Sequence, residues 1–151
     1  NNILQNKEIP VYGNGLQIRD WLYVIDHCKA INCVLEKGKI GEIYNIGGKN
    51  EKKNIEVILE ICSWVDINYN HSNQFFTEKL ITYVKDRPGH DSRYAIDNSK
   101  IAKELNWNPK ETFESGIEKT IKWYVDNQDW VLAVMNGEYK EWIKNQYSNK
   151  K

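Results

Sequence analysis

The stretch Leu80-Ile81-Thr82-Tyr83-Val84-Lys85-Asp86-Arg87-Pro88-Gly89-His90-Asp91 passes directly from an apolar segment into a charged turn. Its first residues are mostly β-branched or aromatic, so we predict a strand over 80–84. The Pro88-Gly89 pair predicts a sharp turn, because proline fixes one backbone dihedral and glycine frees the next. A strand that ends in such a turn gathers Asp86, Arg87 and His90 in one place.

Arginine is rare in this chain, which has only three, at positions 19, 87 and 93. Lysine supplies the rest of the positive charge, so we expect the arginines to lie where a planar guanidinium fork is needed. Such a fork binds phosphate or carboxylate through two hydrogen bonds, which an ammonium group cannot do. We therefore predict an anion-binding loop around residues 85–94. The alternative is an exposed turn whose charges are merely solvated.

The composition narrows the function classes. With 151 residues the chain is long enough for one domain with its own core. Its formal net charge of zero argues against nucleic acid as the main partner. No apolar run approaches the ~20 residues that span a bilayer, so no membrane is expected. The three cysteines, Cys28, Cys33 and Cys62, fit neither a disulfide framework nor a zinc pattern, and we expect buried, reduced thiols in a cytoplasmic protein without a metal.

Two glycines near the start of the chain invite comparison with a dinucleotide-binding motif. Residues 9–12 form a short extended segment, and Gly13-Asn14-Gly15 is a turn. An alternating strand is predicted over 16–24. The Gly-x-Gly lacks a third glycine and precedes a strand, whereas the fingerprint follows a strand and opens a helix. It is therefore not a dinucleotide-binding fingerprint.

The following segments predict a helix, a strand and a second helix. Asp26 is expected to cap the first helix and Gly38 to end it in a left-handed conformation. Its apolar stripe comprises Ala30, Ile31, Val34 and Leu35. A strand over 42–46 then leads into Gly47-Gly48, and Asn54 is expected to cap the next helix. This turn and helix start could offer backbone N–H groups to an anion, although a plain cap is the more common role of such an asparagine.

The rest of the chain reads as helices separated by short connections. Residues 93–96 are extended, Asp97 is expected to cap a short helix, and Thr112 a longer one. Two short helices around Gly137 complete the pattern.

Several of these segments together resemble the dTDP-glucose 4,6-dehydratases, which belong to the extended short-chain dehydrogenases (the NAD-dependent epimerase/dehydratase family). The similarity runs in order through the whole chain. The motifs that carry it are Pro10-Val11-Tyr12-Gly13-Asn14-Gly15, Gln17-Ile18-Arg19-Asp20-Trp21, Tyr44-Asn45-Ile46-Gly47-Gly48, Asp86-Arg87-Pro88-Gly89-His90-Asp91 and Arg93-Tyr94-Ala95-Ile96-Asp97. The first is shared loosely among nucleotide-sugar enzymes, and the block that starts at Asp86 is much more specific.

The resemblance implies an α/β fold, as the C-terminal substrate-binding lobe of such an enzyme, with a few short strands, several helices and no N-terminal Rossmann part. Residues 1–151 would form a C-terminal nucleotide-sugar-binding domain in which residues about 20–50 complete the edge of a missing Rossmann sheet. The resemblance also implies that the full-length enzyme is a lyase (hydro-lyase) of deoxysugar and rhamnose biosynthesis. The full-length enzyme converts dTDP-glucose to dTDP-4-keto-6-deoxyglucose and water, uses tightly held NAD and is a homodimer.

Catalytic residues are not expected in this chain. The resemblance places the catalytic Tyr-x-x-x-Lys pair and the NAD-binding motif upstream of the matched part. The literal match from Tyr147 to Lys151 lies in a polar tail and is taken as chance. With no starting methionine, we expect a fragment that is inactive alone and binds no cofactor by itself.

The resemblance also assigns substrate contacts. Pro10, Val11 and Tyr12 would lie near the thymine and ribose, Arg19 would bind the diphosphate, and Asn54 would bind nearby. The residues Asp86, Arg87, Pro88, Gly89 and His90 would hold ribose and phosphate, and Tyr147 would close over the diphosphate end. One departure is Ser92, where the family usually has arginine, so a local ion pair is in doubt.

Two other functions remain open at this point. The chain could be a stand-alone nucleotide-binding or interaction remnant without catalysis. It could also belong to a related epimerase or decarboxylase, although the Asp86–Asp91 block speaks against this.

Overall fold

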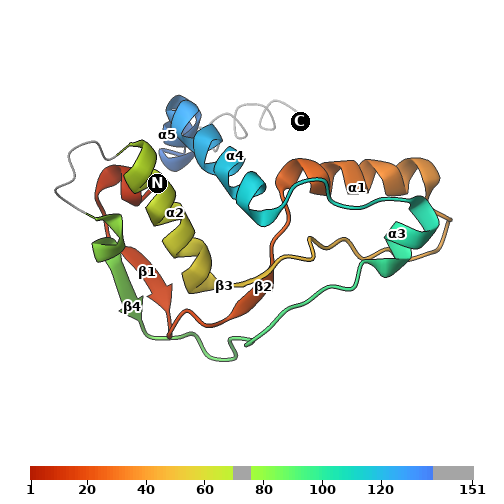
Figure 1. Ribbon diagram of the computed structural model, residues 1–151, viewed down its shortest axis with the longest axis horizontal. Helices are drawn as coiled ribbons and strands as arrows, with labels where there is room; N and C mark the ends of the chain where they lie inside the picture. The colour runs from red at the N-terminus through yellow and green to blue at the C-terminus, as the bar shows by residue number, and fades with distance from the viewer. Residues whose placement is uncertain (70–75, 138–151) are drawn as a thin grey trace, which may run out of the picture. The chain divides into compact units, whose positions relative to one another are not determined.

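The computed structural model describes residues 1–69 and 76–137, which form helices and short strands of an α/β protein (Figure 1). In chain order the elements are η1 (Ile3–Gln5), β1 (Ile9–Tyr12), β2 (Ile18–Asp20), α1 (Val24–Lys37), β3 (Glu51–Lys53), α2 (Asn54–Asn68), η2 (Thr77–Leu80), β4 (Ile81–Val84), α3 (Ser99–Leu105), α4 (Phe113–Asp126) and α5 (Gln128–Met135). None of the helices in this part of the chain could span a membrane.

The chain divides into two compact units, Asn1–Glu118 and Lys119–Lys151. The first unit holds all four strands and three of the α-helices, together with the start of α4. In the second unit, Trp123 packs edge-on against both Tyr124 and Trp130. The candidate site lies entirely in the first unit.

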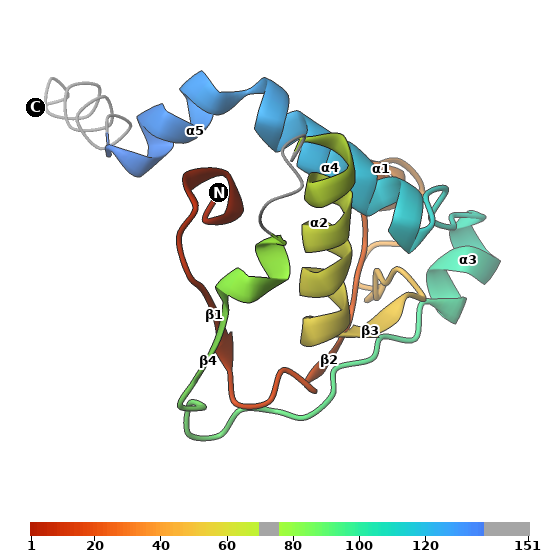
Figure 2. The same ribbon diagram turned by 60° about the vertical axis from the view of Figure 1, so that its left-hand side comes forward.

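Two small sheets organise the first unit (Figure 2). In one, β1 and β4 run parallel with Tyr12 opposite Val84. In the other, β2 and β3 are antiparallel, with Arg19 opposite Lys52. Arg93 also forms an isolated parallel bridge with Ile18, so the loop after β4 runs alongside β2. The predicted strand over 80–84 is confirmed for Ile81–Val84.

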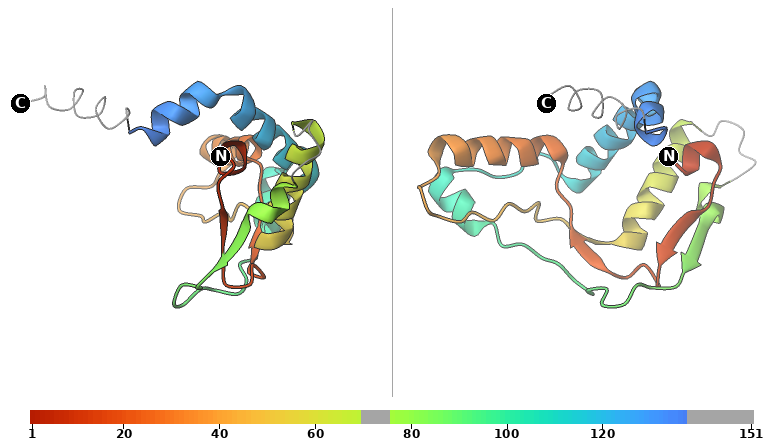
Figure 3. Two further views of the ribbon diagram at one scale, coloured as in Figure 1. Left: turned by 90° about the vertical axis from the view of Figure 1, so that its left-hand side faces the viewer. Right: turned by 180° about the vertical axis from the view of Figure 1, so that it is seen from behind.

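The main core cluster of the first unit lies between α1 and α3. The right-hand view of Figure 3 shows these two helices beside each other. The cluster consists of Ala30, Ile101, Leu105 and Trp107, each at most 8 % exposed. The Cys33 thiol adds a contact of 3.8 Å from Sγ to the Leu105 carbonyl. Of the apolar stripe predicted on α1, Ala30 is buried but Leu35 is 80 % exposed, so α1 leaves one apolar face uncovered in this unit.

The predicted strand over 42–46 was wrong. These residues form neither a helix nor a strand: they pair with no strand in the described part of the chain, and a strand needs a partner for its backbone groups. Instead, Lys100 Nζ binds Glu42 Oε2 at 2.5 Å and the Ile43 carbonyl at 3.0 Å. The side chains of Tyr44 and Ile46 pack against the α1–α3 cluster.

Four of the predicted caps also differ. Asp97 is not the cap of α3, which begins at Ser99 with Asn98 as its cap, although Asp97 Oδ1 accepts the Ser99 N–H at 2.8 Å. Asp26 lies inside α1, and its buried Oδ2 accepts the backbone N–H groups of Lys110 and Glu111, both at 2.8 Å. Gly38 is extended, at φ −65°, instead of left-handed. Asn54 is the first residue of α2, one position after its cap. Thr112 is confirmed as a cap, because its Oγ1 accepts the Ser115 N–H at 3.2 Å.

Candidate functional site

The candidate site forms where the parallel strands β1 and β4 both end. The Gly13 N–H donates to the Val84 carbonyl at 2.9 Å, which joins the turn after β1 to the start of the charged loop. Gly13 has φ +61°, and a Cβ at this position would lie 2.6 Å from Asp86 Oδ2. Glycine is therefore required both for the backbone conformation and for the close approach of the carboxylate. The carboxyl ends of parallel strands are a common place for ligands in α/β proteins.

Asp86 is the centre of a hydrogen-bond network at this point. Its Oδ1 accepts the Arg87 N–H at 2.9 Å and contacts His90 Nδ1 at 2.6 Å. Its Oδ2 accepts the side-chain amide of Gln17 at 3.0 Å. The His90 hydrogen bond is the main reason why the pKa of Asp86 lies below its ordinary value. A carboxylate that accepts from Nδ1 selects the imidazole form whose Nε2 is left for another partner.

Sequence reasoning missed Gln17. This side chain is only 7 % exposed, and it is the residue that reaches Asp86 from the β1–β2 connection. The two residues are 69 positions apart, so no spacing rule could pair them. The only signal in the sequence is a polar residue between a glycine turn and a strand.

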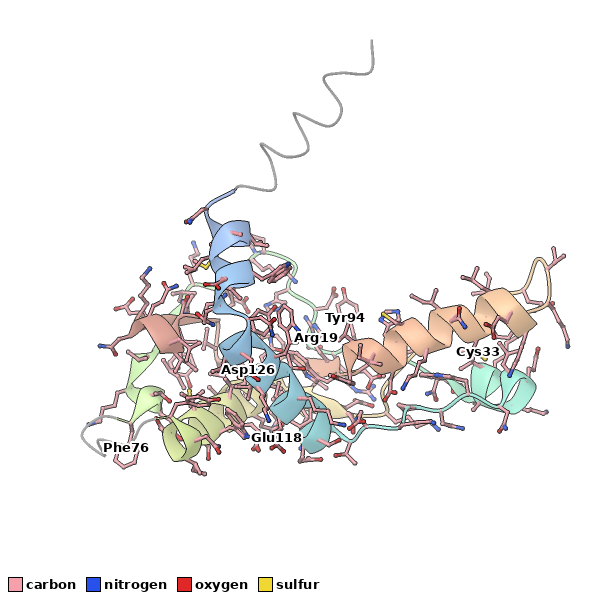
Figure 4. The ribbon with its side chains drawn as sticks, turned by 90° about the horizontal axis from the view of Figure 1, so that it is seen from above. Arg19, Cys33, Phe76, Tyr94, Glu118 and Asp126 are labelled. Carbon is pink, nitrogen blue, oxygen red and sulfur yellow. The ribbon has the colours of Figure 1, made fainter. Side chains whose placement is uncertain are left out.

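Arg19 is engaged inside the protein. One guanidinium nitrogen donates to the Ile18 carbonyl at 2.7 Å and another to the Asp91 carbonyl at 3.1 Å. Its guanidinium also lies over the Tyr94 ring, 4.6 Å from the centroid, and Figure 4 shows the two side chains next to each other. The Tyr94 hydroxyl donates to Asp91, and this bond is the main reason why the pKa of Tyr94 is raised. Arg19 thus holds the charged loop against β2.

The other two arginines differ sharply. Arg93 forms the predicted two-bond fork, but with the Glu51 carboxylate, at 2.7 and 2.9 Å. This hydrogen-bonded pair lowers the pKa of Glu51 and raises that of Arg93. The Arg87 side chain is exposed, and within the described residues it makes no hydrogen bond or ion pair. Arg87 is therefore the arginine whose fork is available to a ligand.

The Gly47-Gly48 turn does bind an anion, but the anion belongs to the protein. Asp20 Oδ2 accepts the Gly48 N–H and Oδ1 accepts the Asn50 N–H, both at 2.8 Å. A Cβ on Gly48 would lie 2.0 Å from the Trp21 carbonyl oxygen, so this turn requires glycine. The backbone donors predicted for a ligand at this turn are thus used internally.

The N-terminus of α2 is similarly occupied. The Lys53 N–H donates to Glu56 Oε2 at 2.9 Å, the Asn54 N–H to the Gln17 carbonyl at 3.0 Å and the Ile55 N–H to the Gly15 carbonyl at 3.0 Å. The backbone of Asn54 is thus hydrogen-bonded to that of Gln17. Only the side chain of Asn54 could bind a ligand from this position.

The remaining predicted contacts lie on β1 and in the tail. On β1, Val11 is 3 % exposed, whereas Pro10 and Tyr12 are exposed on the other face of the strand. Only the backbone of Val11 could reach a ligand. Tyr147 lies outside the described residues.

Pro88 and Gly89 are exposed at the tip of the loop beside Arg87. Among the described residues no cluster of His, Cys, Asp and Glu is suited to a metal ion.

This arrangement agrees with the similarity to known proteins. The family model described as GDP-mannose 4,6 dehydratase matches residues 1–120. The chain belongs to this family. It is 54 % identical over 149 residues to the dTDP-glucose 4,6-dehydratase of Shigella flexneri, a match that covers 99 % of this chain and 41 % of the relative. The predicted homology to the dTDP-glucose 4,6-dehydratases is thus confirmed.

Solved structures of family members match the fold as well. A dTDP-glucose 4,6-dehydratase from Bacillus anthracis, in complex with NAD, is 49 % identical with a TM-score of 0.75, covering 85 % of this chain and 38 % of that one. A dTDP-glucose 4,6-dehydratase from Streptomyces venezuelae, with NAD and TYD bound, is 36 % identical with a TM-score of 0.75, covering 85 % and 37 %. This chain spans about two fifths of the length of the curated relatives that it matches.

Proposed function

We propose that this chain supplies the dTDP-sugar-binding part of a dTDP-glucose 4,6-dehydratase, and that it has no catalytic activity alone. The enzyme would convert dTDP-glucose to dTDP-4-keto-6-deoxyglucose and water. The observation that carries the proposal is the Asp86–His90 loop at the carboxyl ends of β1 and β4, where the Arg87 side chain is exposed and Asp86 holds the imidazole of His90. The high identity to dTDP-glucose 4,6-dehydratases supports the choice of nucleotide.

The loop has the donors that a nucleoside diphosphate needs. A diphosphate carries about two negative charges, which arginine forks can offset without a metal. Arg87 would supply one whole fork. Arg19 donates two guanidinium N–H groups to the carbonyls of Ile18 and Asp91, and its remaining N–H groups would bind the diphosphate. Pro10, Tyr12 and Asn54 would contact the nucleoside from β1 and α2.

The cofactor would be held mainly by the part of the enzyme that this chain does not cover. The relatives from Bacillus anthracis and Streptomyces venezuelae both bind NAD. When bound there, NAD would accept and return the hydride of the reaction, while the residues of this chain would hold the nucleotide. We propose no NAD contact for the described residues of this chain.

We further propose that residues 1–151 act as a C-terminal nucleotide-sugar-binding domain, in which residues about 20–50 complete the edge of a Rossmann sheet. Two observations support this. Leu35 on α1 is 80 % exposed, and residues 42–46 have no strand partner among the described residues. An edge of this kind invites pairing with another strand.

Calorimetric titration of the chain with dTDP, and separately with NAD, tests the proposal. We expect binding of dTDP without NAD, and Arg87→Lys should weaken it by about 1–3 kcal/mol because a charge-assisted fork is lost. Lys29→Gln, which removes one positive charge from α1, is the control and should leave the affinity unchanged. Equal dTDP affinity in the Arg87→Lys and wild-type chains would refute the site. If this chain, joined to the missing part of the enzyme, bound dTDP but did not convert dTDP-glucose, the result would favour the alternative of a nucleotide-binding remnant without catalysis.

A further inference from the structure

Gln17 is held at both its backbone and its side chain. Its carbonyl accepts the first N–H of α2, from Asn54, at 3.0 Å. Its side chain is more than nine-tenths buried and donates Nε2–H to Asp86 Oδ2 at 3.0 Å. The side-chain amide therefore has one orientation relative to Asp86, since the opposite orientation would place its oxygen against a carboxylate.

The carboxylate of Asp86 divides its two oxygens between different partners. Oδ2 accepts a hydrogen bond from the Gln17 side-chain amide. Oδ1 accepts the Arg87 N–H at 2.9 Å and contacts His90 Nδ1 at 2.6 Å. A carboxylate is planar, so holding one oxygen also sets the direction of the other. Gln17 thus determines where Oδ1 lies, and Oδ1 determines the orientation of the His90 ring. The glycine at position 13 leaves the space that this carboxylate occupies.

The amide oxygen of Gln17 is unsatisfied. Oε1 is buried and has no hydrogen-bond partner among the described residues. A buried polar atom without a partner destabilises a fold, and methionine, with a similar shape, would fill this position without that cost. A residue that lowers stability and yet points its donor at a binding loop is typical of a functional site.

We propose that Gln17 is a positioning residue of the nucleotide site. It holds Asp86 so that Asp86 fixes the His90 ring with the proton on Nδ1, and Nε2 is left to the ligand. This inference rests on the proposed function in one respect, namely that the ligand of the loop is a nucleotide. The role of Gln17 towards Asp86 and His90 does not depend on which ligand binds.

The first experiment measures the His90 tautomer. In the wild-type chain, nitrogen-15 NMR at neutral pH should show the His90 proton on Nδ1, and His90→Gln assigns the resonances by their loss. Gln17→Met should give a mixture of the two tautomers. Gln5→Met, an exposed position on η1, is the matched control, and the ring of His27 on α1 is the internal reference. An unchanged His90 tautomer in Gln17→Met overturns the proposal.

The second measurement separates positioning from packing. We expect Gln17→Met to weaken dTDP binding about tenfold while its thermal midpoint stays within ~2 °C of the wild type or rises. A midpoint lowered by more than ~5 °C with unchanged dTDP affinity identifies Gln17 as a packing residue and overturns the proposal. If Gln17→Met does not fold, Gln17→Glu replaces it, because a carboxylate facing Asp86 should disturb the tautomer in the same way. If the wild type binds no dTDP, the proposed function fails, and the tautomer alone decides the role of Gln17.

Discussion

The loop after β4 and the Gly47-Gly48 turn offer the same kinds of anion donors, and the structure uses them differently. At the turn, the backbone N–H groups of Gly48 and Asn50 are filled by the Asp20 carboxylate. At the loop, Arg87 keeps an exposed side chain that makes no hydrogen bond or ion pair within the part of the chain that is described. A carboxylate attached to the chain is always close, so it excludes a dissolved ligand. The presence of donors therefore predicts an anion, but not whether that anion belongs to the protein.

The largest effect should come from the backbone of the internally filled turn. Gly48→Ala would place a Cβ 2.0 Å from the Trp21 carbonyl, and we expect a loss of about 3 kcal/mol or more in the free energy of unfolding. Gly41→Ala is the matched control, since its Cβ meets no atom within 4 Å and only its positive φ is unfavourable. That control should cost about 1–2 kcal/mol. Equal urea unfolding curves for the two variants would contradict the close contact at Gly48.

The next effect should come from the internal anion itself. Asp20→Asn keeps the shape of the side chain but replaces one of the two accepting oxygens with an amide donor. The N–H of Gly48 or of Asn50 then loses its partner, and we expect about 1–3 kcal/mol of destabilisation in urea unfolding at pH 7. Glu60→Gln, an exposed carboxylate on α2, serves as the control. If Asp20→Asn is as stable as the control, the turn does not depend on this carboxylate.

A pair of arginine variants tests the contrast within the loop. Arg87→Lys should weaken dTDP binding and leave the thermal midpoint unchanged, because its fork faces solvent. Arg93→Lys should do the reverse: the fork to Glu51 is lost, so the midpoint should fall slightly, while dTDP affinity stays the same. Calorimetry and thermal unfolding of both variants measure this. The opposite assignment of effects would mean that Arg93 is the ligand-binding arginine.

The smallest effect is a pH dependence of the loop. The pKa of Asp86 is lowered in the folded chain, chiefly by His90, so its contribution to stability is present above the unfolded pKa of about 4 and disappears as the pH falls below it. Asp86→Asn should therefore lose less stability than the wild type between pH 5 and pH 2. Thermal midpoints across this range provide the measurement. Parallel curves for the two proteins would show that Asp86 gains nothing from its partners.

Features that depend on neighbouring residues could be predicted from the sequence. The strand predicted over 80–84 follows from its β-branched residues and is observed over Ile81–Val84. The Thr112 cap follows from a hydroxyl residue directly before the apolar helical pattern that starts at Phe113. The two-bond fork of a rare arginine was also predicted, and Arg93 forms one. These features need only local backbone geometry or the chemistry of one side chain.

Features that depend on residues far apart in the chain could not be predicted from the sequence. Asp26 looked like a helix cap, but its buried oxygen accepts N–H groups 84 and 85 positions later. The strand predicted at 42–46 has the right residues and no partner in the described chain. Gln17 had no visible role until the fold placed it against Asp86.

The sequence by itself determined the family, the turn at Pro88-Gly89 and the residue types of the charged loop, because these depend on local chemistry and on the order of motifs. Only the tertiary structure decided which donors are already occupied: Asp20 fills the glycine turn, Glu51 takes the fork of Arg93, and Arg87 remains open. The physical reason is that hydrogen bonds between residues far apart in the chain are chosen by folding, and each donor that is satisfied internally is lost to a ligand.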